Sequence, residues 1–177
     1  MILFVFRIHI EALIYMHYCS TLATPIGLCS IRGTDTHICS IYFDKEAIHD
    51  VLPNSITEQG KKELQEYFDL KRDQFTFPWL QKGTDFQQRV WRHLSEIPIG
   101  WPISYAKLSE KMNHPLAIRA IASANGKNQL AIVVPCHRVI GSSGNLVGYA
   151  GGLWRKKWLL EHEAQLAGKE QTMFHFG

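Results

Sequence analysis

The period of the hydrophobic pattern changes partway along this 177-residue chain. Residues 19–43 alternate between apolar and polar side chains around a Gly-Thr-Asp-Thr turn at 33–36, a pattern typical of an antiparallel hairpin. Residues 57–69 follow a helical period, and Pro78 with the Gln-Lys-Gly stretch at 81–83 then interrupts it. The predicted inner face of that helix consists of Leu64, Tyr67 and Phe68. The first part of the chain is therefore predicted to be a small sheet with one helix, followed by a linker.

Helical spacing resumes after the linker. Thr84 and Gln87 have the spacing of a capping box, and apolar residues recur behind them at helical intervals. These apolar residues are Phe86, Val90, Trp91 and Leu94. Two further short helices are expected at 104–112 and 115–124, and the turn between them favours a helix-turn-helix. A second domain is therefore predicted to begin at Thr84.

Positive charge is concentrated in the second part of the chain. Residues 101–177 contain nine Lys and Arg against four Asp and Glu, whereas residues 1–100 contain ten against twelve. Such an excess suits a polyanionic partner, although many solvated surfaces are mildly basic. The hydrophobic content of 46% is enough to fill a core.

Four scattered cysteines, at positions 19, 29, 39 and 136, indicate reduced thiols in a cytoplasm rather than a disulfide scaffold. The first three, with His17 and His37 nearby, lack the close pairs typical of zinc ligands, so no metal site is predicted. Residues 1–15 are apolar but broken by charged side chains, and they fit neither a signal peptide nor a membrane span. We expect them to be an extension or a misassigned start, since Met16 would make an alternative beginning just ahead of the first strand.

A cysteine follows an apolar run in the second part of the chain. Residues 131–134 (Ala-Ile-Val-Val) indicate a buried strand, and Pro135 cannot donate a ladder hydrogen bond beyond it. Cys136 is therefore expected where a strand leaves the core, with His137 beside it. Glu163 stands on the apolar face of a helix, where a carboxylate needs a partner. A cysteine, a histidine and a carboxylate can together form a thiolate nucleophile with its proton acceptor.

Taken singly, these residues have plainer interpretations. An isolated Cys-His pair is more often a structural cysteine beside a surface histidine. In an extended segment the side chains of Cys136 and His137 would point to opposite faces, so a contact would need a bridging water. Glu163 alone would most simply form an ion pair with a nearby Lys or Arg.

Four other residues also have structural interpretations on their own. Tyrosines such as Tyr105 and Tyr149 usually pack with the hydroxyl at a wet edge, and asparagines such as Asn128 often cap turns. Arg119 is the only charged residue in a predicted helix rich in alanine and serine. It fits a phosphate contact or a solvated surface position equally well.

The whole set of motifs closely resembles the O6-alkylguanine-DNA alkyltransferases. The shared residues are Asn128 eight positions before Cys136, an intact Pro-Cys-His-Arg-Val, Tyr149 in Gly-Tyr-Ala-Gly-Gly, Glu163, and Tyr105 in Ile-Ser-Tyr. The match is dense over residues 84–165 and looser through Thr21–Gly27. It implies an α+β fold, with a small N-terminal domain of antiparallel sheet and helix at 16–80. A C-terminal helix-turn-helix (winged-helix-like) domain at 84–168 would carry the active-site cysteine, and 169–177 would form a tail.

By this resemblance, the protein repairs DNA through an irreversible, single-turnover transfer of an alkyl group from O6-alkylguanine to Cys136. His137, acting through water and oriented by Glu163, would accept the thiol proton. Tyr105 would assist the departing guanine by supplying a proton to its ring, and Asn128 would brace the loop around the site. No cofactor is implied.

The resemblance also implies the partner. Double-stranded DNA containing O6-alkylguanine, with O4-alkylthymine as a further candidate, would be bound by a cytoplasmic monomer. The helix of small residues would lie in the minor groove, and Arg119 would fill the stack left by the extruded nucleotide. The expected DNA contacts are Arg119, Ala120, Ser123 and Arg138. The expected pocket residues are Tyr149, Ala150 and Val139.

Some family members bind zinc in the N-terminal domain, but Thr34 and Cys39 stand where those members have cysteine and histidine ligands, so no zinc is expected here. Three other functions remain as alternatives, and each would require a feature that the sequence does not show or a different kind of kinetics. A lesion sensor of the alkyltransferase-like type would lack the cysteine, a helix-turn-helix transcriptional regulator would need an effector or dimerisation segment, and a cysteine hydrolase would turn over repeatedly.

Overall fold

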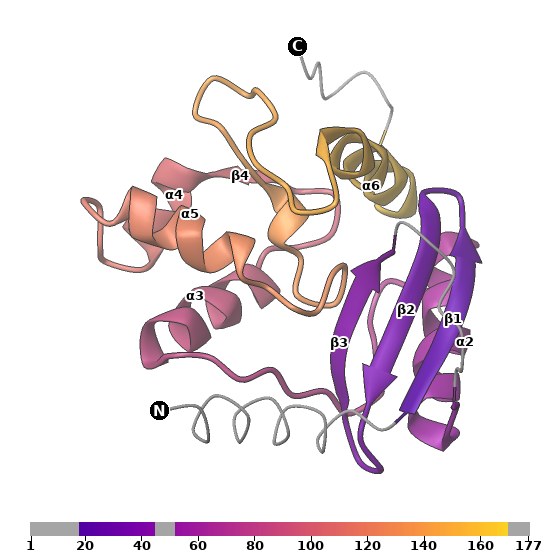
Figure 1. Cartoon of the computed structure of the whole chain (residues 1–177). Coiled ribbons are helices and arrows are strands. Elements are labelled where there is room, and N and C mark those ends of the chain that lie inside the picture. The colour runs from indigo at the N-terminus through magenta and orange to yellow at the C-terminus, as the bar shows by residue number, and fades with distance from the viewer. Residues whose placement is uncertain (1–17, 45–51, 170–177) are drawn as a thin grey trace, which may run out of the picture. The chain divides into compact units, whose positions relative to one another are not determined.

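A computed structural model describes residues 18–44 and 52–169 of the chain (Figure 1). They form a mixed α+β protein with a small antiparallel sheet and a set of helices, which confirms the predicted fold class. The expected extension at 1–15 and the tail beyond Lys169 lie outside the described residues. No helix of the described part has the length and apolar character needed to cross a membrane.

The chain separates into two compact units, Met1–Gln81 and Lys82–Gly177. The first unit contains a three-stranded antiparallel sheet in the order β1 (Tyr18–Thr24), β2 (Gly27–Gly33) and β3 (Ile38–Phe43). The apolar residues that alternate along these strands supply the core of this unit, because side chains on one face of each strand point to the same side.

A single hairpin was predicted over residues 19–43, but the structure has three strands joined by two turns there. The predicted turn does join β2 to β3, where the Thr34 backbone N–H donates to the His37 carbonyl at 2.9 Å. A second turn at 25–26 adds β1 in front of it. Gly27 has a φ of 110°, a conformation that glycine adopts without strain. Pro25 and Gly27, which are typical turn residues, mark this second turn in the sequence.

One helix, α2 (Ser55–Phe68), packs on the sheet, chiefly on β1 and β2 (Figure 1). It begins two residues before the predicted start because Asn54 and Thr57 form a reciprocal capping box. A methyl group at Gly60 would stand 2.3 Å from the end of the Ile38 side chain, so a larger residue there would require that side chain to move. The predicted inner face is confirmed by the buried side chains of Leu64, Tyr67 and Phe68.

The second unit begins with α3 (Asp85–Ser95). Thr84 and Gln87 form the predicted capping box. The buried residues of the helix are Val90, Trp91 and Leu94, whereas Phe86, expected on the same face, is only half-buried. The Trp91 indole N–H donates to the carbonyl of Ala124 at 2.9 Å, which ties α3 to the helix described next.

The predicted helix-turn-helix consists of α4 (Tyr105–Lys111) and α5 (Ile118–Gly126). α5 begins three residues later than expected because the chain from Pro115 onward is still completing the turn. Asn113 starts that turn with a φ of 57°, a left-handed conformation that asparagine tolerates. The remaining long helix, α6 (Leu153–Leu166), turns its apolar face into the same unit.

The strand predicted at 131–134 is absent, and tight turns take its place. Ile132, with a φ of 73°, is the centre of a three-residue turn in which the Val133 N–H donates to the Ala131 carbonyl at 2.9 Å. Within residues 18–44 and 52–169 the segment pairs with no strand, although Ile132 and Val134 are buried as predicted. An apolar run of this length indicates burial without specifying the backbone conformation.

Candidate active site

Two consecutive turns present the cysteine at the edge of the second unit. Pro135 has φ −81° and ψ 62°, the geometry of an inverse γ-turn, and the Cys136 N–H donates to the Val134 carbonyl at 2.8 Å. A 3₁₀ turn, Cys136–Arg138, follows directly. Ile132 is a β-branched residue at positive φ, a strained conformation that is found mainly where function requires a special backbone.

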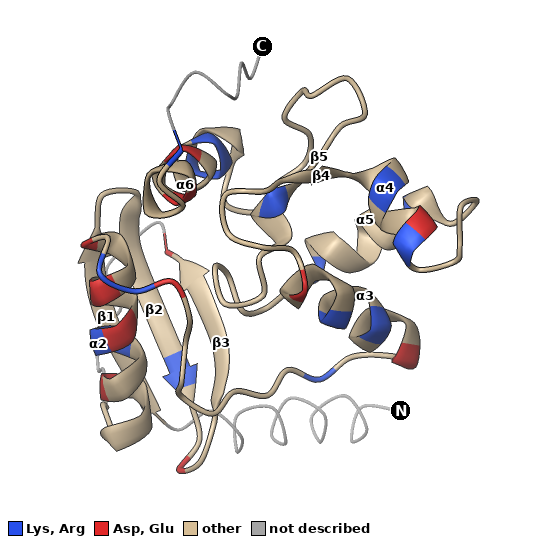
Figure 2. Ribbon diagram, turned by 180° about the vertical axis from the view of Figure 1, so that it is seen from behind, with Lys and Arg blue, Asp and Glu red and all other residues tan. Residues whose placement is uncertain are grey.

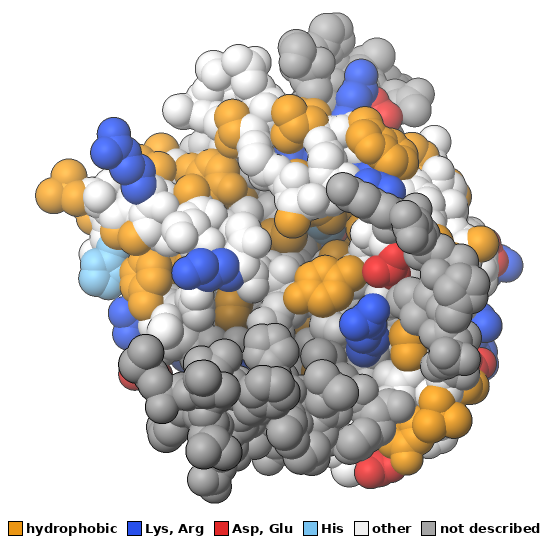
Figure 3. Space-filling view, viewed as in Figure 1, with side chains coloured by type: hydrophobic (Ala, Val, Ile, Leu, Met, Phe, Trp, Pro, Cys, Tyr) orange, Lys and Arg blue, Asp and Glu red, His pale blue; other side chains and the backbone are white. Residues whose placement is uncertain are grey.

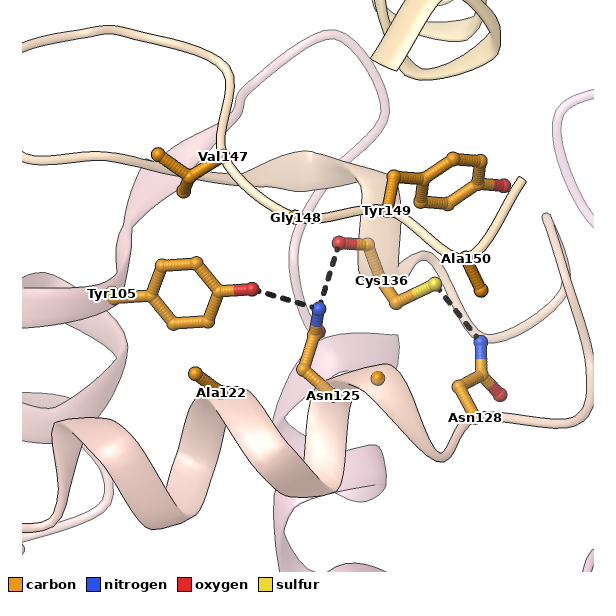
Figure 4. Close-up of a pocket in the computed structure, with 10 residues that line it drawn as sticks. Tyr105, Ala122, Asn125, Asn128, Cys136, Val147, Gly148, Tyr149 and Ala150 are labelled. Carbon is orange, nitrogen blue, oxygen red and sulfur yellow. Dashed lines mark hydrogen bonds between the residues drawn. The ribbon is translucent and has the colours of Figure 1, made fainter. Parts of the chain in front are cut away.

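The Asn128 side chain holds this segment together. Its amide nitrogen donates to the Val134 carbonyl at 2.8 Å, and its amide oxygen accepts from the Leu130 N–H at 3.0 Å. The same nitrogen lies 3.2 Å from the sulfur of Cys136 (Figure 4). The Asn128 side chain therefore braces the loop and also donates a hydrogen bond to the sulfur of Cys136.

A short parallel strand pair brings Tyr105 to the cysteine. β4 (Ile103–Ser104) pairs with β5 (Val139–Ile140), and Tyr105 is the residue that follows β4. Because Cys136 comes just before β5, the pairing sets the two side chains at one pocket (Figure 4).

The Glu163 carboxylate bridges His137 and Arg138. One of its oxygens lies 2.8 Å from His137 Nε2, and the guanidinium of Arg138 donates to both oxygens at 2.7 and 2.8 Å. Glu163 and His137 are fully buried. Glu163 therefore forms both of the contacts considered for it, an ion pair with an arginine and a hydrogen bond with the imidazole.

The charge states follow from this burial. Burial raises the pKa of the Cys136 thiol, although the Asn128 hydrogen bond and the Lys156 charge partly oppose the shift. Burial lowers the pKa of His137, and Glu163 opposes that shift without reversing it. Burial acts to raise the pKa of Glu163, but His137 and Arg138 outweigh it and hold that pKa at about 2. A neutral thiol, a neutral imidazole and an ionised carboxylate are therefore the resting state at neutral pH.

The second nitrogen of His137, Nδ1, is buried and has no hydrogen-bond partner among the described residues. With Nε2 bonded to the Glu163 carboxylate, Nε2 carries the ring proton and Nδ1 is left as a free acceptor. An acceptor in this position can take a proton from the neighbouring thiol, directly or through one water.

Lys156 lies under the pocket and was missed by the sequence analysis. Its ammonium donates to the carbonyls of Val139 and Val147 at 2.6 and 2.7 Å, and burial lowers its pKa to about 8. It stands seven residues before Glu163, on the same face of α6, so the reasoning that singled out a charged side chain on an apolar face applied to it equally.

These elements enclose a pocket of about 310 Å³ (Figure 4). A volume of this order accommodates a small planar ligand. Its lining residues are Tyr105, Ala122, Asn125, Gly126, Asn128, Cys136, Val147, Gly148, Tyr149 and Ala150. The predicted pocket residues Tyr149 and Ala150 belong to this set. Val139 does not, because it is fully buried behind the pocket in β5, where its carbonyl accepts from Lys156.

Among the predicted DNA contacts, Arg119, Ala120 and Ser123 are exposed on α5. Basic and apolar side chains gather over α4 and α5 in Figure 3, and further Lys and Arg lie on α3 and α4 in Figure 2. Arg138, which was also expected to contact DNA, differs from the other three residues because it is not exposed. It is 8% exposed, and its guanidinium is occupied by Glu163 and by the carbonyl of Ile97. Its guanidinium therefore holds the Glu163 carboxylate and is not presented at the surface as Arg119 is.

Asn125 is the second residue missed by the sequence analysis. It is 4% exposed and lies between Tyr105 and Cys136, yet a single asparagine in an alanine-rich helix carries no sequence signal of its own. In the described residues no group of three or more His, Cys, Asp or Glu side chains is arranged to hold a metal ion.

Two family descriptions match the sequence. Residues 17–80 match "6-O-methylguanine DNA methyltransferase, ribonuclease-like domain" and residues 85–165 match "6-O-methylguanine DNA methyltransferase, DNA binding domain".

Individual proteins are similar over most of their length. The chain is 38% identical over 167 residues to the constitutive methylated-DNA–protein-cysteine methyltransferase of Bacillus subtilis (strain 168), covering 88% of this chain and 100% of the relative. It is 43% identical over 132 residues to the protein of the same name from Shigella flexneri, covering 73% and 75%. The crystal structure of Mycobacterium tuberculosis O6-methylguanine methyltransferase is 36% identical with a TM-score of 0.76, over 89% of this chain and 99% of that one. A crystal structure of Mycobacterium tuberculosis OGT in complex with DNA is 36% identical with a TM-score of 0.77, over 88% and 97%.

Proposed function

This chain belongs to the 6-O-methylguanine DNA methyltransferase family, and from that premise we propose that Cys136 is the residue that accepts the alkyl group. The protein is a DNA-repair enzyme that transfers an alkyl group from methylated DNA to a cysteine of its own chain, and DNA is its partner. Of its four cysteines, Cys136 alone lines the pocket and is followed by a buried histidine–carboxylate pair. That arrangement is the observation that carries the assignment.

The reaction starts from a neutral Cys136 thiol and a neutral His137 imidazole that can accept its proton. The Cys136 proton passes to Nδ1 of His137, through one water, and the ionised Glu163 stabilises the imidazolium that forms. The thiolate then attacks the alkyl carbon on O6 of guanine. A carbon–sulfur bond forms, the carbon–oxygen bond breaks, and its electron pair remains on the guanine. The guanine ring takes up a proton from solvent, and the imidazolium later returns the thiol proton to solvent, so the protons balance.

Tyr105 assists the departing base as a hydrogen-bond donor. Burial is the main cause that raises the pKa of its hydroxyl to about 12, and the negative charge of Cys136 as a thiolate acts in the same direction. At neutral pH the hydroxyl therefore keeps its proton and stabilises the charge that develops on the guanine ring. Donating a hydrogen bond is a narrower role than the supply of a proton to the ring, which the family resemblance implies for Tyr105.

The base must leave the duplex to reach the sulfur, because a thiolate cannot approach O6 in line from within the stack. The exposed small residues of α5 allow the helix to lie close to a minor groove, and Arg119 projects from the same helix. The Arg119 side chain forms no hydrogen bond or ion pair with the described residues, so it is free to occupy the vacated stack. We assign the alkylated base in duplex DNA as the substrate, handled by a cytoplasmic monomer without cofactor.

Intact-mass analysis after incubation with duplex DNA containing O6-methylguanine tests the assignment. We expect a gain of one methyl group per chain, located on Cys136 by peptide mapping, and no further gain with excess substrate. Cys136→Ala should bind the DNA and gain nothing, whereas the matched variant Cys39→Ala should be methylated like the wild type. Methylation of the Cys136→Ala variant would overturn the assignment. Repeating the assay with O4-methylthymine DNA decides whether that base is also a substrate.

A further inference from the structure

Asn125 makes two hydrogen bonds at the centre of the site (Figure 4). Its amide nitrogen lies 2.9 Å from the hydroxyl oxygen of Tyr105 and 3.5 Å from the carbonyl oxygen of Cys136. The side chain is 4% exposed and lies on the last turn of α5, so neighbouring atoms restrict its movement.

The carbonyl of Cys136 determines which way the amide of Asn125 faces. A carbonyl oxygen can only accept, so the group that faces it must be the NH₂ of Asn125 and not the amide oxygen. The opposite orientation would place two acceptors against each other. The amide oxygen, Oδ1, is buried without a hydrogen-bond partner among the described residues, so both hydrogen bonds of this side chain there are made by its nitrogen.

This orientation decides what Tyr105 can do. A hydroxyl group has one proton and two lone pairs, and the N–H of Asn125 already occupies one lone pair. The Tyr105 proton cannot point back at a donor, so it is directed toward the pocket that the ring lines. A hydroxyl that accepts one hydrogen bond also becomes a stronger donor of another.

We propose that Asn125 is a positioning residue that holds the Tyr105 hydroxyl as a hydrogen-bond donor toward the reacting base. This role rests on the proposed transfer of the alkyl group to Cys136. It implies that Asn125 acts on the departure of guanine and not on the nucleophile. A reaction at Cys136 whose leaving group needs no hydrogen bond should then be indifferent to Asn125.

Two reactions at the same sulfur separate these effects. The first is methyl transfer from O6-methylguanine duplex DNA in single turnover, and the second is alkylation of Cys136 by iodoacetamide, followed at the Cys136 peptide, in which iodide leaves unaided. Asn125→Leu, which has a similar volume and no donor, should slow methyl transfer roughly tenfold or more and change the iodoacetamide rate less than about twofold. Asn125→Asp, whose carboxylate draws the Tyr105 proton to itself, should lower the ratio of the two rates further than Asn125→Leu does.

A double-mutant cycle with Tyr105→Phe completes the test. Because Asn125 acts through the hydroxyl, Asn125→Leu should cost less than about twofold in methyl transfer when that hydroxyl is already absent. Equal slowing of both reactions in Asn125→Leu, or losses that multiply in the double variant, would overturn the positioning role. A wild-type protein that is never methylated on Cys136 would instead refute the proposed function itself.

Discussion

Glu163→Gln is the substitution whose effect can be worked out most fully from the site. The pKa of Glu163 lies at about 2 instead of its ordinary 4.5. At about 1.4 kcal/mol per pKa unit, that difference represents roughly 3 kcal/mol of folding free energy at neutral pH. The substitution also leaves the guanidinium of Arg138 buried without its counter-charge, a loss of about 3–5 kcal/mol in comparable buried pairs. These figures describe one loss in two ways, so we expect about 3–5 kcal/mol in total.

Domains of this size are stable by about 5–15 kcal/mol, so Glu163→Gln should still fold, with a lower urea midpoint. The rate of methyl transfer should fall by about 10²–10⁴-fold, because neutral glutamine cannot stabilise the imidazolium of His137. Single-turnover transfer from radiolabelled DNA, measured where both proteins are fully folded, gives the rate. Urea unfolding gives the stability.

Arg138→Gln is the matched control. It breaks the same ion pair but leaves the carboxylate of Glu163 on His137 at 2.8 Å. Its stability should fall by a similar amount while transfer is slowed by less than about tenfold. If Glu163→Gln transferred at the wild-type rate despite its lower stability, the carboxylate would serve only the ion pair, and the proton-transfer mechanism above would be wrong.

Two further outcomes are expected. Arg119→Ala should slow repair of duplex DNA more than attack on free O6-alkylguanine base, because only the duplex must be opened at a cost of a few kcal/mol; equal losses in the two second-order rates would assign Arg119 to the pocket or the fold. Stability should fall with acidity in two stages. Below pH 6.5 the unfolded chain protonates His137 while burial keeps the native imidazole neutral, and from pH 4.5 down to about 2 the ionised Glu163 loses its contribution. Urea midpoints across this range should show both stages, and the second should be smaller in Glu163→Gln but not absent, because the pKa of buried Glu63 is also lowered. Burial acts to raise that pKa, but the hydrogen bonds of Glu63 to Thr76 and Gln59 and the charge of Arg72 outweigh it. A second stage of unchanged size in Glu163→Gln would place its origin elsewhere.

Sequence reasoning succeeded where the signal was local. The helical periods, the capping box at Thr84 and the turn between β2 and β3 were readable because each depends on residues within a few positions of one another. The same reasoning failed at 131–134, where an apolar run indicated burial but the backbone forms turns instead of a strand. Burial is a property of side-chain chemistry, whereas strand formation needs a partner that the run itself does not name.

The proposed reacting groups could be read from the sequence alone: a cysteine behind proline, a histidine beside it, and a carboxylate on an apolar helix face. How these groups are connected became visible only in the folded chain. Arg138 turns inward to Glu163, 25 residues away, instead of outward to DNA, and Asn125 reaches Tyr105 across 20 residues of chain. Contacts at such separations arise when helices and turns pack, and packing selects among many partners that the same residues could chemically satisfy. The identity of each group can therefore be predicted from the sequence, whereas its charge state, orientation and partner depend on how the protein folds.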